Sequence, residues 1–144
     1  MSLNLSEITE GMSLPELNKI VTQESVIKYA DASGDHNPIH LDPGFAAKMG
    51  LNGTVAHGML VLAFVSSHMT TIFGEDWLTG GSINVKFKEP ARPGDVLKIT
   101  GKINKLVKQE HCSTIFCDVL CRNNRNETII TGEATVKLKE DYVI

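Results

Sequence analysis

The sequence has few cysteines, and none of them is placed to build a disulfide framework. The three are Cys112, Cys117 and Cys121, an odd number within one short segment and without a CxxC spacing. On an extended strand, Cys117 and Cys121 would share a face about 13 Å apart, beyond the reach of a disulfide. This pattern excludes a small disulfide-stapled secreted domain, and we expect a protein of the reducing cytoplasm.

Basic blocks, a secretory signal and a long apolar run are also missing. Lys and Arg total 14 against 17 Asp and Glu, a net charge of −3, and no cluster of cations is present to neutralise phosphates. The first residues have neither the basic nor the apolar region of a signal peptide. The most apolar stretch, residues 57–73, would span only about 25 Å as a helix and includes serine, histidine and threonine. We therefore expect neither nucleic acid nor a membrane as a partner.

No internal repeat, low-complexity tract or linker divides the 144 residues, which is an ordinary length for one domain with its own core. We expect a single domain over residues 1–144. The pattern of its first half is largely helical. The expected elements are a short strand within residues 14–22, a helix from Thr22 to Gly34, a short helix from Pro43 to Lys48, and a long buried helix over residues 57–73.

The second half has the period of β-strands. Strands are predicted at residues 82–88, 95–107, 111–122 and 128–138. The third of these is apolar on both faces, as a central strand would be, and residues 123–126 supply the last hairpin. Residues 74–81, which carry Trp77, are expected to form a loop. The order predicts an α+β fold in which an antiparallel sheet, a meander of four strands after the long helix, wraps around that central helix.

A turn-rich stretch carries the residue types that acid–base chemistry needs. In GDHNPIH, residues 34–40, Pro38 disfavours a helical conformation at Asn37, so no helix is expected to run from Asp35 to His40. An irregular loop can bring the Asp35 and His40 side chains together. The amide of Gly58, at the start of the long helix, could then stabilise a negative charge that develops nearby. This combination predicts a catalytic acid–base pair with an oxyanion donor.

Each candidate also has a simpler structural interpretation. An Asp in such a turn commonly bonds its own backbone, Asn37 can brace the loop, and His57 can cap or pack beside Gly58. His36, Asn37, His40 and Asp42 could also be interpreted as a metal cluster. Their spacing puts no three of them on one side of a helix or strand, and soft ligands are lacking, so no metal is expected.

A longer pattern surrounds these residues. Tyr29 is followed by the small residue Ser33, then by Gly-Asp-x-Asn-Pro-aliphatic-His, with the small residue Ala46 six positions later. This motif, with AHGM at residues 56–59 and the closing TGEATVKL, resembles the (R)-specific enoyl-CoA hydratase, or MaoC-like dehydratase, family of hotdog-fold proteins. Ala32 stands where a larger aliphatic residue or glycine is commoner, which affects no catalytic position. The similarity covers nearly the whole chain.

The resemblance implies a hotdog fold and (R)-specific hydration of trans-2-enoyl-CoA to (R)-3-hydroxyacyl-CoA, with the reverse dehydration. It implies no metal or redox cofactor, and CoA only as part of the acyl-CoA thioester substrate. By the same resemblance, Asp35 and His40 hold one water, and the amide of Gly58 binds the thioester oxygen.

Four further residues are expected to contact substrate: Asn37, Ser66, Met69 and Val136. The resemblance places a serine at the position of Ser66, two turns beyond Gly58, and helical spacing puts Met69 on the same face. Met69 and Val136 are expected to shape the acyl pocket. A single hotdog sheet leaves one face uncovered, and the family pairs sheets edge to edge, so we expect a homodimer with CoA near the interface.

Two alternatives use the same fold. A thioesterase would carry its catalytic carboxylate on the central helix, but residues 57–73 contain no Asp or Glu. A non-catalytic module that binds acyl-CoA or acyl carrier protein would be expected to have lost the acid or the base. This chain retains both Asp35 and His40, and turnover is the observation that separates the hydratase from the binding module.

Overall fold

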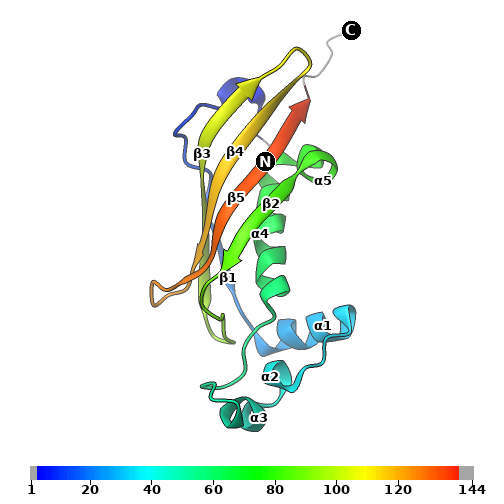
Figure 1. The fold of residues 1–144 in the computed structure, drawn as a ribbon, viewed down its shortest axis with the longest axis vertical. Coiled ribbons are helices and arrows are strands. Elements are labelled where there is room, and N and C mark those ends of the chain that lie inside the picture. The colour runs from blue at the N-terminus through cyan, green and yellow to red at the C-terminus, as the bar shows by residue number, and fades with distance from the viewer. Residues whose placement is uncertain (1–2, 140–144) are drawn as a thin grey trace.

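The computed structural model describes residues 3–139, and it has the predicted architecture of an antiparallel sheet that curves along a long helix (Figure 1). The elements in chain order are η1 (Leu5–Glu7), β1 (Leu17–Ile20), α1 (Gln23–Ser33), α2 (Pro38–Leu41), α3 (Pro43–Lys48), α4 (Gly58–Phe73), α5 (Glu75–Gly80), β2 (Ser82–Phe87), β3 (Val96–Lys108), β4 (Cys112–Arg122) and β5 (Thr128–Lys139). Across residues 3–139, no helix combines the length and the apolar character needed to cross a membrane.

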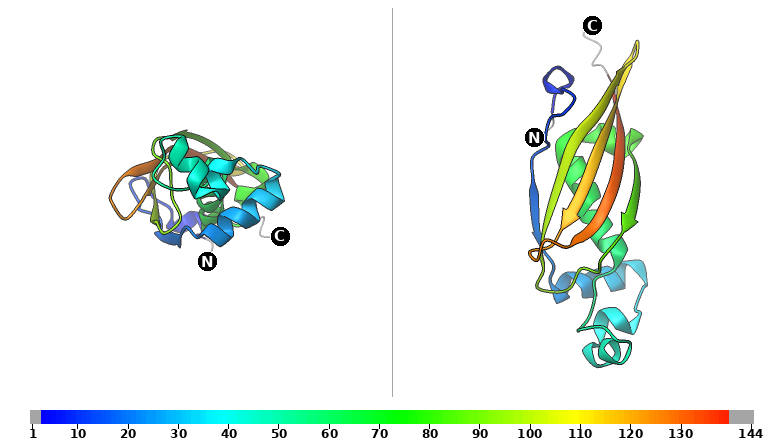
Figure 2. Two further views of the ribbon diagram at one scale, coloured as in Figure 1. Left: turned by 90° about the horizontal axis from the view of Figure 1, so that it is seen from below. Right: turned by 60° about the vertical axis from the view of Figure 1, so that its left-hand side comes forward.

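The helix ends follow local signals in the sequence. The side chain of Thr22 accepts a backbone N–H in the first turn of α1, and Gly34, at φ +77°, ends that helix in the left-handed conformation. Asp42 caps α3 in the same way, with Pro43 at the first helical position. As a result α1, α2 and α3 gather beyond the N-terminal end of α4, as Figures 1 and 2 show.

The core lies between α4 and the sheet. Residues with no exposed surface include Met69, Leu97, Ile99, Ile103, Ile115, Ile130 and Val136. Burial of an aliphatic side chain of this size contributes roughly 1.5–3 kcal/mol. The burial of these side chains holds α4 against the sheet. Because α4 is held in this way, the position of its N-terminus is also fixed.

The predicted meander of four strands is wrong in one respect. The strand order in the sheet is β1-β3-β4-β5-β2, so only β3, β4 and β5 form a meander. Strand β2 pairs with β5, with Ile83 opposite Ala134, and it does not pair with β3. The connection at residues 88–95 is long enough to cross the end of the sheet and deliver β3 beside β1. Alternation identifies a strand and its buried face, but it does not identify the neighbouring strand.

Residues 74–81 were expected to form a loop, and that expectation is also wrong. After Gly74 the chain forms the short helix α5, with Glu75 and Asp76 in its first turn, where negative charge suits the helix dipole. Its stability comes from tertiary contacts: Trp77 is buried, and its indole N–H donates to Ser66 Oγ at 3.0 Å. A contact of this kind cannot be read from the eight residues themselves.

The stretch from residue 34 to residue 40 is partly irregular and partly helical. Asn37 has a non-helical backbone, at φ −56° and ψ 127°, so no helix runs from Asp35 to His40, as predicted. Beyond Asn37 the chain forms the single turn α2, which contains His40. Pro38 opens this turn, because a proline is well suited to the first position of a helix. His40 therefore projects from a short helix, and Asp35 lies on the loop before it.

Candidate active site

The carboxylate of Asp35 has two separate roles. Its Oδ1 accepts the backbone N–H of Asn37 at 3.2 Å, and the backbone N–H of Asp35 donates to Ser33 Oγ at 3.2 Å. These bonds shape the loop, as the simpler structural interpretation of this Asp predicts. Its other oxygen, Oδ2, lies 3.9 Å from His40 Nε2, and the side chain remains half exposed. One oxygen therefore holds the turn while the other is available for chemistry.

The hydrogen bonds of His40 define its tautomer. The residue is 8% exposed, and its Nδ1 lies 2.7 Å from the carbonyl oxygen of Val55. Since a carbonyl oxygen only accepts, Nδ1 carries the proton and Nε2 has a free lone pair. The 3.9 Å between that lone-pair nitrogen and Asp35 Oδ2 is too long for a direct hydrogen bond, but it suits two acceptors that share one water molecule.

Residues 54–57, which we call the bridging segment, hold α2 in place. The N–H of Val55 donates to the carbonyl oxygen of Ile39 at 3.1 Å. Thr54 Oγ1 donates to Gln23 Oε1 at 2.8 Å, and Gln23 Nε2 in turn donates to the carbonyl oxygen of His40 at 2.9 Å. The backbone of His40 is thereby bonded to α1, and its ring is bonded to the bridging segment.

His57 was expected to cap or pack, and its side chain packs without making a cap hydrogen bond. Its ring stacks on His40, with centroids 3.7 Å apart and planes at 25°, and Tyr29 lies against it at 4.8 Å. Its Nε2 lies 2.9 Å from the carbonyl oxygen of Asp35, so Nε2–H is the donor. The sequence signalled the position of His57 beside Gly58 but gave no sign of these contacts.

Gly58 is the first residue of α4 and is exposed. The first N–H groups of a helix have no partner within the helix, and the helix dipole favours negative charge near them. A Cβ added at Gly58 would lie 3.2 and 3.3 Å from two ring carbons of Phe87. Glycine therefore keeps open a narrow approach to this helix end, between the backbone and the Phe87 ring.

The residues predicted to contact substrate fall into different environments. Asn37 is exposed and caps α2 by accepting the N–H of Ile39 at 3.2 Å, so it braces the loop. Ser66 is half-buried and accepts the indole N–H of Trp77. Met69 and Val136 are fully buried in the core of the single chain. The structure thus brings Asp35 and His40 together, and it places Met69 and Val136 in the packed interior.

Asp35, His40 and His57 also form the single group of potential metal ligands found within residues 3–139, with ligand atoms within 4.8 Å of one another. The rings of His40 and His57 are stacked, and the lone pair of each ring nitrogen lies in the plane of its ring. A metal ion close to both rings would therefore lie outside the plane of at least one of them, where that ring has no lone pair to offer. The residues weighed as ligands from the sequence are dispersed. His36 bonds to Asp31 at 2.9 Å, which raises the pKa of His36, and Asp42 caps α3. The geometry suits acid–base chemistry better than metal binding.

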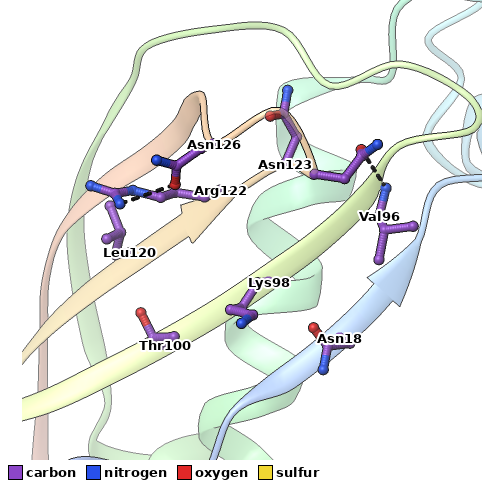
Figure 3. A pocket seen from close by; sticks show the side chains of 9 residues that line it. Asn18, Val96, Lys98, Thr100, Leu120, Arg122, Asn123 and Asn126 are labelled. Carbon is purple, nitrogen blue, oxygen red and sulfur yellow. Dashed lines mark hydrogen bonds between the residues drawn. The ribbon is translucent and has the colours of Figure 1, made fainter.

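A separate groove lies on the outer face of the sheet, where Lys98, Thr100 and Asn18 project away from α4 (Figure 3). Two of its charged side chains have partners, one inside the groove and one outside it. Arg122 donates to Asn126 Oδ1 at 3.2 Å, and Lys98 is paired with Glu16 at 3.6 Å. This groove contains none of the candidate catalytic residues.

Comparisons with known proteins agree with the fold and with the motif. The family model described as "MaoC like domain" matches residues 7–125. The chain is 30% identical to the (R)-specific enoyl-CoA hydratase of Rhodospirillum rubrum over 132 residues, which cover 90% of this chain and 88% of that protein. It is 30% identical to the mitochondrial 3-hydroxyacyl-[acyl-carrier-protein] dehydratase of Arabidopsis thaliana over 123 residues, 83% of this chain and 72% of that protein.

A solved structure gives the same result. The (R)-hydratase from Aeromonas caviae involved in PHA biosynthesis has a TM-score of 0.76 and 27% sequence identity, and the match covers 91% of this chain and 97% of that one. The similar proteins named here are hydratases and dehydratases, and the five-stranded sheet around α4 is the hotdog fold. With a family match over most of its length and relatives at 30% identity, the chain belongs to the MaoC-like domain family.

Proposed function

We propose that this protein is a hydro-lyase that adds water to a trans-2-enoyl-CoA to give the (R)-3-hydroxyacyl-CoA, and that also catalyses the reverse dehydration. The observation that carries the proposal is the pair of Asp35 Oδ2 and His40 Nε2, both acceptors, 3.9 Å apart. The N-terminus of α4 follows His57, whose ring stacks on His40 and bonds the backbone carbonyl oxygen of Asp35. Relatives with the names of this reaction support it.

The two acceptors suit a single bound water. Water donates one O–H to Asp35 Oδ2 and the other to His40 Nε2, which leaves an oxygen lone pair directed at C3 of the substrate. As the C3–O bond forms, Asp35 accepts the water proton, and His40 orients the water and assists transfer of that proton to C2. The proton removed and the proton delivered are equal in number, so no net charge or redox change results. Both additions come from one side, which predicts syn addition.

The negative charge that develops on the thioester oxygen needs a donor. We propose the N–H of Gly58 for this role, because it belongs to the first turn of α4. Loss of one such donor costs about 10² to 10³ in rate in other enzymes. Asn37, Ser66, Met69 and Val136 remain our proposed substrate contacts, with the acyl chain running along α4. Met69 and Val136 have no exposed surface, so the proposal requires the core beside them to open when the acyl chain binds. The chemistry needs no metal or redox cofactor.

We also propose a homodimer with the CoA near its interface. Strand β2 lies at one edge of the sheet, paired with β5 alone. Two large apolar side chains beside Gly58, Met59 and Phe87, are 56% and 51% exposed. A partner subunit that covers them would also enclose the site and exclude water. Light scattering at micromolar concentration tests this proposal, and a monomer would contradict it.

The test of the proposed function is turnover of crotonyl-CoA, followed by the loss of absorbance of the conjugated thioester. Asp35→Asn and His40→Ala are measured beside the wild type, and the product is analysed on a chiral column. Hydration to the (R) product that both substitutions abolish supports the hydratase. Binding without turnover of crotonyl-CoA or longer enoyl-CoAs would instead identify the binding module. A relative that acts on acyl carrier protein makes the crotonyl-carrier thioester the natural second substrate.

A further inference from the structure

Resting on the proposed function, we propose that His57 is a positioning residue that sets the separation of Asp35 and His40. It contacts both of them through different parts of one ring. Its face stacks on His40 at 3.7 Å, and its Nε2–H donates to the carbonyl oxygen of Asp35 at 2.9 Å. Asp35 lies on a loop and His40 lies on α2, so a third group is needed to relate them.

The stacking contact restrains the ring of His40. The hydrogen bond to Val55 fixes one nitrogen of His40 but leaves the ring free to rotate about that bond. The face of His57, inclined by 25°, limits this rotation. The lone pair of His40 Nε2 therefore keeps a fixed direction, and Asp35 Oδ2 lies 3.9 Å from this nitrogen.

The hydrogen bond restrains the other partner. Asp35 is exposed and lies in a loop, and its own other hydrogen bonds are local, to Ser33 and Asn37. The bond from His57 joins this loop to the residue that directly precedes α4. It also relates Asp35 to Gly58, because the peptide that links His57 to Gly58 carries the proposed oxyanion donor.

A packing role alone would not require an imidazole at this position. His57 is 3% exposed, and its Nδ1 is buried without a hydrogen-bond partner among residues 3–139. A buried polar atom without a partner opposes folding, and a phenylalanine would fill the same space without that atom. The hydrogen bond from Nε2–H to Asp35 therefore explains why this position has a histidine and not a phenylalanine.

The test compares two substitutions that separate the two contacts. His57→Phe keeps a flat ring for stacking and removes the donor, whereas His57→Gln loses the ring and keeps an N–H at a similar reach. The matched control is His68→Phe. His68 is also a buried histidine, on α4, and its Nε2 has no hydrogen-bond partner within residues 3–139. It lies ten residues beyond Gly58 along the chain, away from the proposed acid–base pair. Steady-state hydration of crotonyl-CoA and amide hydrogen exchange are measured for each protein.

For His57→Phe we expect kcat to fall by about 10², as when catalytic groups shift by about 1 Å, with KM changed less than about two-fold. Amide exchange should accelerate at residues 34–40 and stay unchanged in the strands. His57→Gln should recover part of kcat, and His68→Phe should keep the kcat of the wild type. A wild-type kcat in His57→Phe would overturn the proposal, as would exchange that rises throughout the chain.

Failure of the proposed function gives a different result. If the wild type hydrates no enoyl thioester, the catalytic proposal is wrong, but the exchange experiment still decides the role of His57. Faster exchange confined to residues 34–40 in His57→Phe then supports a residue that holds this loop. Unchanged exchange there overturns the positioning role, whatever reaction the site performs.

Discussion

His40 and His57 stack at 3.7 Å, yet each donates through a different ring nitrogen. His40 uses Nδ1 toward the carbonyl oxygen of Val55, and His57 uses Nε2 toward that of Asp35. The ring nitrogen of His40 without a proton is therefore Nε2, which faces the Asp35 carboxylate. For this reason His40 can accept a hydrogen bond from water in the resting protein.

The first prediction is that the two neutral rings have opposite tautomers. Long-range ¹H–¹⁵N correlation spectra, recorded at a pH at which both rings are neutral, should show His40 as the Nδ1–H form and His57 as the Nε2–H form. Spectra of His57→Phe and His40→Ala assign the signals. A His40 that carries its proton on Nε2 would contradict the hydrogen bond to Val55 and the proposed water site.

The second prediction concerns Asp35→Asn. The amide keeps an oxygen to accept the N–H of Asn37, so the loop and the melting temperature should be preserved. The oxygen that faces His40 is replaced by an amide NH2, which donates hydrogen bonds and cannot accept a water proton, so hydration should slow by about 10² to 10⁴, the usual contribution of general acid–base catalysis. The control is Asp31→Asn, an exposed carboxylate of α1 that pairs with His36. Equal losses of activity in both variants would contradict a specific role for Asp35.

The third prediction separates two effects of Gly58→Ala. Alanine favours helix by up to about 1 kcal/mol, but its methyl group would press on the Phe87 ring, which lies 3.2 Å from the added carbon. We expect a lower melting temperature and a large loss of kcat. In the double variant Gly58→Ala/Phe87→Ala the ring is absent, so the added methyl group should not lower the melting temperature below that of Phe87→Ala. The methyl group should still block the approach of the thioester, so kcat should stay low. Recovery of full activity in the double variant would contradict the proposed approach to the helix end.

The fourth prediction concerns the cysteines, which are free thiols. Burial raises the pKa of Cys117 and of Cys121 to about 12, so at pH 8 the reactive thiolate is nearly absent from both. Cys112 is half-buried and should react first. Mass spectrometry after iodoacetamide should find one alkylated cysteine in the folded protein and three after denaturation. Alkylation of Cys117 in the folded protein would show that the core opens.

The fifth prediction is a loss of stability in mild acid that depends on His68. Burial lowers the pKa of this histidine below 6.5, although a hydrogen bond to the Pro15 backbone opposes the shift. Below pH 6.5 the unfolded chain binds a proton more readily than the folded chain, so the free energy of unfolding falls as the pH drops toward the folded-state pKa. Chemical denaturation between pH 8 and pH 5 should show a smaller decline in His68→Phe. The same decline in both proteins would assign the effect to other groups.

The sequence predicted those features that depend on local chemistry. The cap at Thr22, the proline that opens α3 and the acid–base motif all act within a few residues of the chain. The partner of β2 could not be predicted, because pairing depends on where the crossover at residues 88–95 delivers the next strand. The helix around Trp77 escaped prediction because the contact with Ser66 that stabilises it is tertiary.

The candidate site shows the same division. Asp35 and His40 were found from their motif, and the geometry adds which atoms face each other. His57 was interpreted as a residue that caps or packs, because nothing in a linear pattern reveals a ring stacked on a residue 17 positions earlier. Helical spacing put Met69 on the same face of α4 as Gly58. That face is exposed at Gly58 and buried at Met69, because α4 passes beneath the sheet along its length.

The bridging segment sets a limit for protein engineering. Its four consecutive residues each bond a different part of the chain: Thr54 to α1, Val55 to α2, Ala56 to the crossover before β3, and His57 to the Asp35 loop. A one-residue insertion or deletion here would shift all four contacts at once. Libraries aimed at new acyl substrates should therefore keep the length of residues 54–57 constant and place their variation on α4 and α5.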